Sequence, residues 1–300
     1  MGAPRNLDEV EVFLKNMFND KNIITVKSSL LRKFIAFMIV QSRKKEAKSN
    51  YQKLGGTSPL VKHTEDFNKK AKELFFEYEV ATIMRYTPPF ASEVLQKLKQ
   101  KGISEIYLFP LYPQYSTTTT KSSLEDIDEN LKKLDYEPKI TVLEKFYKEE
   151  FYLNKIVSQI KESLKSHKAK DFELIFSAHS LPQKIVDAGD PYQKEVKKQV
   201  ELLKKMLDDM EFKDIHLAYQ SKLGPVKWLE PSLEQKLSSI KSKNVIIYPI
   251  SFILDNSETE FELSMEYAEF AKEKGFDNYI VCPCINADEE FVKSLCNLKL

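Results

Sequence analysis

A chain of 300 residues is long enough for about two domains, and its apolar content of 42% and charged content of 30% are typical of a globular protein in water. The 46 basic and 45 acidic residues leave a formal charge of +1, which argues against nucleic-acid binding through a strong positive field. Three cysteines predict a reducing compartment, so we expect a cytoplasmic protein, and no apolar run approaches the roughly 18 residues of a membrane span. The seven glycines form none of the glycine-rich signatures that cradle phosphates, so no dinucleotide cofactor is expected.

The first predicted elements are a turn and two helices. Met1–Pro4 is typical of the turn after a strand and a helix starts near Leu7, yet no strand precedes the turn. The first strand of a doubly wound sheet is usually central, so we expect a start further upstream or a fragment; a peripheral first helix is the alternative. The next helix, Leu30–Tyr51, is apolar nearly all round in its first half and is flanked by basic residues. It predicts either a buried helix or an exposed apolar lip that admits an apolar ligand or touches a membrane surface.

Further along, short β-rich runs alternate with longer segments of helical periodicity. Strands are predicted at Glu79–Met84, Glu105–Leu111, Lys139–Leu143, Glu173–Ala178, Ile215–Tyr219, Val245–Ile250 and Tyr279–Cys282, and further helices at Ser122–Leu134, Phe151–His167, Gln193–Met210 and Glu258–Lys274. This alternation predicts an α/β fold, and the continuous apolar runs predict parallel strands buried on both faces. Two domains fit the length, residues 1–148 and 149–300, with a boundary where the charged Lys148–Glu150 opens a helix; the last helix could pack back on the first domain.

One histidine stands at a predicted strand end. The apolar run Leu174–Phe176 leads to His179, and Pro182 and the turn Gly189–Tyr192 follow. Ligands of open α/β sheets lie at the carboxyl ends of the strands, so His179 is placed where chemistry would occur. A structural histidine with satisfied hydrogen bonds is the alternative.

A row of carboxylates follows the run Val245–Ile250. Glu258, Glu262 and Glu266 are four residues apart, so a helix would place them on one face. Such a row at a strand end can raise pKa values and guide a proton or a cation. The alternative is a solvated acidic helix start, which the helix dipole favours.

Two further segments offer groups that could hold an anion. The loop Pro110–Ser123 is rich in hydroxyls and leads into a helix, so it can donate hydrogen bonds to a carboxylate; an ordinary N-capped loop is the alternative. Leu54–Leu60 contains a Gly-Gly pair that permits close approach. Arg85 at a strand end can fork onto a carboxylate or form a structural ion pair.

Together these segments resemble the ferrochelatase family. FSAHSLP with GDPY (176–192), LYPQYSTTTT with two following serines (111–123), LGGTSPL (54–60), YQSKLGPVKWLEP (219–231) and the pattern PISF..D.SET..E (249–262) match the family in order and spacing, from Met1 to about Asn286. The resemblance implies a chelatase fold of two Rossmann-like domains with a porphyrin cleft between them. It also implies insertion of Fe²⁺ into a porphyrin as the last step of haem synthesis, with porphyrin and Fe²⁺ as substrates and no permanently bound cofactor.

The same match implies roles for individual residues. His179 matches the family's essential histidine, which takes a proton or contacts the metal transiently, and Glu258 matches the acidic residue of the SET motif across the cleft. Both are therefore expected to be catalytic and to contact the metal. Glu262 and Glu266 would continue a proton or metal path. The residues expected to bind the porphyrin are Met1, Leu30, Leu31, Phe34, Ser58, Arg85, Tyr86, Tyr115, Ser116, Thr118, Ser122 and Ser123. The apolar residues of the lip favour protoporphyrin IX over coproporphyrin III and predict peripheral membrane contact.

Some positions depart from the family pattern. Asn256 stands where many members have histidine, and Lys121 where glycine is usual. Members with a [2Fe-2S] cluster use four cysteines, whereas this chain has three and carries Thr117 at one ligand position, so no cluster is expected. The alternatives are a coproporphyrin III ferrochelatase or another class II-type chelatase such as a cobalt chelatase, a non-catalytic porphyrin- or haem-binding protein, and an inactive truncated form.

Overall fold

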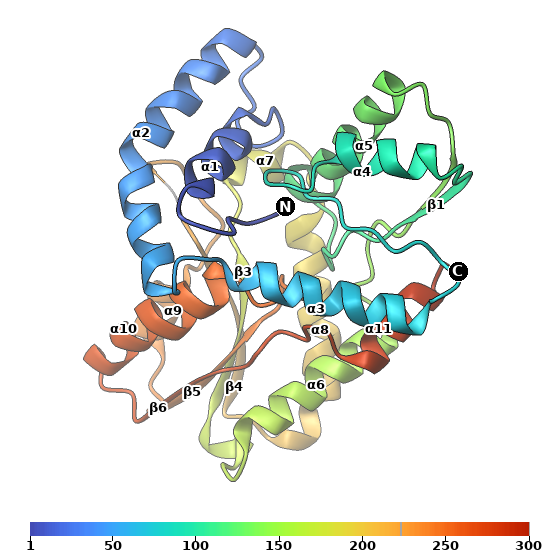
Figure 1. Cartoon of the computed structure of the whole chain (residues 1–300). Coiled ribbons are helices and arrows are strands. Elements are labelled where there is room, and N and C mark those ends of the chain that lie inside the picture. Colours follow the sequence, from blue (N-terminus) through green and yellow to red (C-terminus); the bar gives the residue numbers. More distant parts are fainter. Residues whose placement is uncertain (223, 300) are drawn as a thin grey trace. The chain divides into compact units, whose positions relative to one another are not determined.

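The computed structural model describes residues 1–222 and 224–299 (Figure 1). The chain forms two compact units. Unit 1 holds Met1–Pro110, Ser116–Glu144 and the residues from Ala287 onward, and unit 2 holds Leu111–Tyr115 and Lys145–Asn286. The chain thus changes unit close to the predicted boundary at Lys148. A short segment before that point lies in unit 2, and the last helix lies in unit 1.

Unit 1 combines helices with a short parallel pair of strands. In chain order its elements are α1 (Glu9–Asn19), α2 (Ser29–Lys53), α3 (Pro59–Leu74), α4 (Ala91–Gln100), β1 (Glu105–Leu108), a π-helix (Thr117–Lys121), α5 (Ser122–Lys133), β2 (Lys139–Val142) and α11 (Glu289–Asn297). β1 pairs with β2 in parallel, and α11 lies against α3, where Lys70 Nζ is 3.0 Å from a Glu289 carboxylate oxygen.

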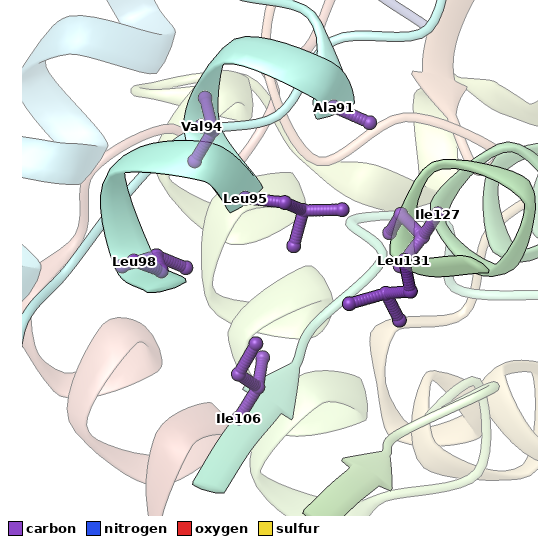
Figure 2. Packing of buried hydrophobic residues seen from close by; sticks show 7 residues of the cluster. All are labelled: Ala91, Val94, Leu95, Leu98, Ile106, Ile127 and Leu131. Atoms are coloured by element: carbon purple, nitrogen blue, oxygen red, sulfur yellow. The ribbon is translucent and has the colours of Figure 1, made fainter. Parts of the chain in front are cut away.

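The core of unit 1 follows directly from helical spacing. Ala91, Val94, Leu95 and Leu98 recur on one side of α4, and together with Ile106 of β1 they are buried. Ile127 and Leu131 of α5 complete the cluster, and Figure 2 shows the seven side chains between α4, α5 and β1.

The predicted strand Glu79–Met84 is wrong. Every residue of this segment is described, and it contains only an isolated bridge between Met84 and Phe90. The backbone groups at its end are engaged by turns, because the Met84 N–H donates to the Pro89 carbonyl, while the Arg85 and Tyr86 N–H groups donate to the Met1 carbonyl. A β-rich composition therefore did not suffice without a strand partner.

Unit 2 is a parallel sheet covered by helices on both faces. Its described strands are β3 (Glu173–His179), β4 (Asp214–Gln220), β5 (Asn244–Pro249) and β6 (Asn278–Val281), arranged in the order β4-β3-β5-β6. Its helices are α6 (Glu150–Leu164), α7 (Gln183–Asp187), α8 (Tyr192–Met206), α9 (Leu233–Ser239), a π-helix (Glu258–Glu266) and α10 (Tyr267–Glu273), with 3₁₀ turns at Ala169–Asp171 and Asp208–Met210. The prediction of parallel strands is confirmed. The two central strands, β3 and β5, are buried on both faces as predicted, whereas the edge strands β4 and β6 are partly exposed.

Two predicted helices of unit 2 differ in detail. The segment Gln193–Met210 forms α8 only as far as Met206, and its last residues form a 3₁₀ turn. The segment Glu258–Lys274 begins as a π-helix and becomes α-helical only at Tyr267. π-Helical turns are rare and often occur at functional sites.

The two faces of the unit 2 sheet are covered by different helices. Ile175, Val245 and Ile247 pack against α9 and Leu263 of the π-helix. Alternate residues point to the other face, where Phe176 meets Tyr248 and the Tyr248 hydroxyl donates to Gln159 of α6 at 2.9 Å. This double cover leaves the carboxyl ends of the strands as the edge at which a site can form.

Candidate active site

His179 is the last residue of β3, and its ring nitrogen Nδ1 lies 2.7 Å from the Glu258 carboxylate oxygen Oε2. Glu258 opens the π-helix that follows β5, the strand next to β3. The expectation that Glu258 lies across a cleft from His179 is therefore wrong, because the two side chains are direct hydrogen-bond partners. They retain exposed fractions of 38% and 29%, so a substrate can reach the pair.

The charges of the pair shift both pKa values. Burial lowers the pKa of His179, but the charge of Glu258, its hydrogen bond and the charge of Glu262 outweigh burial, so the pKa is raised. Burial raises the pKa of Glu258, but the charge and hydrogen bond of His179 and the hydrogen bond of Ser221 outweigh it, so the pKa is lowered. The carboxylate of Glu258 therefore makes the neutral imidazole of His179 a stronger base, and it stabilises the imidazolium that forms when the ring accepts a proton.

Ser221 joins Glu258 to Glu262. It follows β4 directly, its N–H donates to Glu262 Oε1 at 2.8 Å, and its hydroxyl lies 2.6 Å from Glu258 Oε2 and also contacts Glu262 Oε2. A hydroxyl has one hydrogen, so when both contacts are made one carboxyl must itself donate. Ser221 has a φ of +64°, a left-handed conformation that non-glycine residues rarely adopt and that often marks functional sites.

Glu262 is the carboxyl best suited to carry that proton. Burial and the charge of Glu258 outweigh the hydrogen bonds from Ser221 and the charge of His179, and raise the pKa of Glu262 to about 7. In the resulting arrangement the Glu262 carboxyl donates to Ser221 Oγ, which donates to Glu258, which accepts from His179. Glu266 is the last residue of the same π-helix and is exposed.

Sequence reasoning placed His179, Glu258 and Glu262 in the site but missed Ser221. Its segment, YQSKLGP, was noticed only as part of a family pattern, although a hydroxyl directly after a buried strand is a usable signal. The contact itself could not be foreseen, because Ser221 and Glu258 are 37 residues apart.

Several residues predicted to bind porphyrin gather in unit 1 around a buried carboxylate. The Tyr86 hydroxyl donates to Asp20 Oδ2 at 2.7 Å, the Ser122 hydroxyl also donates to Asp20, and Arg85 Nε donates to Ser122 Oγ at 3.1 Å. Arg85 also lies 3.5 Å from Asp20 and 3.4 Å from Asp126. Sequence reasoning missed Asp20, and the ion-pair alternative considered for Arg85 describes these contacts.

The other predicted porphyrin residues lie at several places. In unit 1, the Met1 carbonyl accepts from the Arg85 and Tyr86 N–H groups, Ser58 precedes α3 and is buried, and the Ser116 hydroxyl accepts from the Thr118 N–H at 3.1 Å. Ser123 is the second residue of α5. Tyr115 lies in unit 2, where its N–H donates to Glu195 at 2.8 Å. Leu30, Leu31 and Phe34 are exposed on α2, so the buried-helix alternative does not describe its first half.

Few side chains that could bind a metal ion lie close together in the part of the chain that the structure describes. Within residues 1–222 and 224–299, no group of three His, Cys, Asp or Glu side chains is placed to hold a metal ion. Imidazole and carboxylate are ligand types that Fe²⁺ accepts, and His179 and Glu258 supply one of each. Cys282, Cys284 and Cys296 are buried thiols, and the expectation that the chain carries no [2Fe-2S] cluster stays a prediction.

The sequence model of the family Ferrochelatase matches residues 1–299. The chain belongs to the ferrochelatase family. It is 51% identical over 298 residues to the ferrochelatase of Nitratiruptor sp., covering 99% of this chain and 96% of that relative. It is 50% identical over 301 residues to the ferrochelatase of Sulfurimonas denitrificans, covering 99% and 95%. The family is that of metal chelatases, lyases that insert a metal ion into a porphyrin, so porphyrin and iron are its substrates.

Solved structures agree on the fold. SirB from Bacillus subtilis with Fe³⁺ matches with a TM-score of 0.55 at 12% identity, covering 80% of this chain and 89% of that one. The sirohydrochlorin chelatase SirB from B. subtilis subspecies spizizenii, in complex with cobalt, matches with a TM-score of 0.55 at 11% identity, covering 79% and 87%. At this identity the likeness shows the chelatase fold alone.

Proposed function

We propose that this chain inserts Fe²⁺ into protoporphyrin IX, forming protohaem with release of two protons, as the last step of haem synthesis. The observation that carries the proposal is the hydrogen-bonded series from His179 through Glu258 and Ser221 to Glu262. Metal insertion requires a base for each pyrrole proton and a route by which the proton leaves, and this series supplies both.

The proton steps follow from which atoms are already engaged. Nδ1 of His179 bonds Glu258, so in the neutral ring Nε2 keeps the lone pair that can accept a pyrrole proton, while the N–H bonding electrons stay on the porphyrin. Glu262 first releases the proton it holds. The imidazolium can then pass its Nδ1 proton to Glu258, and Ser221 accepts a proton from Glu258 while its own hydroxyl hydrogen passes to Glu262. Because the pKa of Glu262 is about 7, this carboxyl can release one proton near neutral pH and accept the next. His179 is then neutral again for the second pyrrole proton.

The exposed apolar side chains of α2 support protoporphyrin IX over coproporphyrin III. Leu30 and Phe34 have exposed fractions of 79% and 61%, and they offer apolar surface to a ring edge that carries vinyl groups. Coproporphyrin III carries four charged propionates, two more than protoporphyrin IX, and apolar surface does not compensate their desolvation.

An anaerobic assay with Fe²⁺ and either porphyrin, following loss of the free-base spectrum, tests the proposal. We expect turnover with protoporphyrin IX, and His179→Ala should lower turnover at least 10²-fold while porphyrin affinity stays within about tenfold. Turnover only with coproporphyrin III would reassign the substrate. Porphyrin binding without turnover would favour a carrier protein or an inactive form, and full activity of His179→Ala would refute the assigned role of the histidine.

We further propose that the first half of α2 contacts an anionic membrane surface. Leu30, Phe34, Phe37 and Met38 recur at helical spacing and are exposed. The exposed Lys33 lies among them, and the exposed Lys27 lies just before the start of the helix. Apolar side chains beside basic ones are typical of helices that lie on anionic lipid. Among the described residues, no helix combines the length and apolar character needed to cross a bilayer.

Sedimentation with vesicles tests this surface. Vesicles containing phosphatidylglycerol should pull down the protein more than vesicles of phosphatidylcholine alone, and Leu30→Ser with Phe34→Ser should abolish the difference. Phe76→Ser is the matched control, because Phe76 is an exposed phenylalanine outside α2. Equal sedimentation of the wild type and the double variant would contradict the proposal.

A further inference from the structure

At His179 the strand β3 still pairs with β4, but its pairing with β5 has already ended. β3 pairs with β5 only as far as Ser177, opposite Pro249, and the Ile250 N–H donates to the Ser177 carbonyl at 3.0 Å. On the other side, the Ser180 N–H donates to the Gln220 carbonyl of β4 at 2.9 Å. Successive residues of a strand turn their peptide groups to opposite neighbours, so the N–H and C=O of His179 face β5, beyond the end of that pairing.

Two side chains make the hydrogen bonds to the His179 peptide that β5 would make if its pairing with β3 continued. Ser251 Oγ accepts from the His179 N–H at 3.3 Å, and the Tyr192 hydroxyl donates to the His179 carbonyl at 2.9 Å. The two hydroxyls lie 2.6 Å apart. Because the Tyr192 hydrogen is used on the carbonyl, Ser251 must donate to the Tyr192 oxygen.

These contacts form a closed ring of hydrogen bonds. The order is His179 N–H to Ser251 Oγ, Ser251 O–H to the Tyr192 oxygen, and Tyr192 O–H to the His179 carbonyl. Every hydrogen in the ring is used once, and each bond polarises the next. The backbone of the histidine is thus held at both its donor and its acceptor.

The Gly189–Tyr192 turn explains why the tyrosine is in this position. Asp190 Oδ1 accepts from the Tyr192 N–H at 2.9 Å, and α8 begins at Tyr192. Gly189 has a φ of +101°, which a residue with a side chain rarely adopts. Tyr192 and Asp190 are both buried, with exposed fractions of 6% and 5%. The turn therefore presents the tyrosine hydroxyl from a buried and fixed base.

We infer that Tyr192 and Ser251 are positioning residues for metal insertion, which replace the missing strand partner of His179 and so fix the direction of its imidazole towards Glu258. This inference rests on the proposed function of His179 as the proton acceptor. A base must be held in a defined geometry to be effective, and small misplacements lower the rate more than the binding of substrate. Sequence analysis noted the GDPY and PISF segments but gave neither residue this role.

The test compares Tyr192→Phe, Ser251→Ala and the double variant with wild type. Tyr192→Phe should lower kcat about tenfold and leave the KM for porphyrin within about twofold. Either single change opens the ring, so the double variant should lose much less than the product of the two single effects. Tyr136→Phe is the matched control, because its hydroxyl also donates to a backbone carbonyl, that of Ile103, at 2.5 Å in unit 1. Its kcat should equal that of wild type.

Amide hydrogen exchange at His179 gives a readout that does not depend on activity. The amide should exchange at least about tenfold faster in Tyr192→Phe and Ser251→Ala, and at the wild-type rate in Tyr136→Phe. Unchanged exchange together with unchanged kcat would overturn the inference. If the wild-type protein inserts no metal, the proposed function fails, and faster exchange would then show that the ring holds a histidine with a different role. If Tyr192→Phe does not fold, Ser251→Ala alone removes one hydroxyl and makes the same test.

Discussion

Because folding raises the pKa of Glu262, we predict that the stability of the protein decreases as the pH rises through the range in which this carboxyl titrates. The fold raises the pKa of this carboxyl from 4.5 to about 7, through burial and the charge of Glu258. Below pH 4.5 both the folded and the unfolded chain hold the proton, so Glu262 contributes nothing. Between pH 4.5 and 7 the folded chain binds more protons than the unfolded chain, so the free energy of unfolding falls as the pH rises.

The change Glu262→Gln removes this loss. A rise of the pKa from 4.5 to about 7 corresponds to about 3 kcal/mol at neutral pH and above. Glutamine keeps the contacts of the protonated acid, because its carbonyl can accept from the Ser221 N–H and its amide can donate to Ser221 Oγ. We therefore expect the variant to gain stability over wild type as the pH rises from 4 to 8.5, by up to about 3 kcal/mol.

Differential scanning calorimetry across this pH range measures the gain. For a unit of this size, about 3 kcal/mol corresponds to an increase in Tm of about 6–12 °C relative to wild type at the same pH. Glu269→Gln is the matched control for the change in net charge, since Glu269 is exposed on α10. A difference between Glu262→Gln and wild type that is the same at pH 4 and pH 8.5 would refute the reasoning, because it would show that folding does not hold the proton.

Two further predictions concern unit 1. Asp20→Asn should lower the stability of this unit by about 3 kcal/mol. The buried carboxylate accepts hydrogen bonds from Tyr86, Ser122 and the Asn22 N–H, and in asparagine an amide nitrogen, itself a donor, would lie against one of these donors. Amide hydrogen exchange in α1 and α5 should become faster, and unchanged exchange would contradict the network. Gly2→Ala should lower the Tm, because an added Cβ would lie 2.5 Å from Thr87 Oγ1 at a φ of +93°, and we expect this strain to cost about 1–3 kcal/mol. Gly55→Ala is the control, because Gly55 has a similar φ of +87° but open space around its Cβ position. An equal loss of stability in both variants would place the cause in the backbone conformation alone.

Local sequence determined most of the regular structure. The apolar runs of β3 and β5 are continuous because both faces of these strands are buried, and that pattern is visible in the sequence alone. The helices α4 and α5 carry their core residues at helical spacing, so the sequence also indicates which side of each is buried. The segment Glu79–Met84 shows the limit, because its β-rich composition is not matched by a strand partner.

The candidate site was predicted in its residue types but not in its contacts. His179 could be placed at a strand end and Glu258 and Glu262 on one helix face, since both follow from local patterns. Their geometry depends on which strands are neighbours. His179 and Glu258 are 79 residues apart and meet because β3 lies beside β5 in the sheet.

The sequence by itself determined the alternation of strands and helices, the buried faces and the presence of a base and carboxylates at strand ends, because these depend on spacing within one element. Only the tertiary structure decided that Ser221 bridges two carboxyls, that Asp20 gathers Arg85, Tyr86 and Ser122, and that Tyr192 and Ser251 close a ring on His179. Hydroxyls and buried carboxylates acquire such roles through partners far along the chain, and no local periodicity records which partners the fold brings within hydrogen-bonding distance.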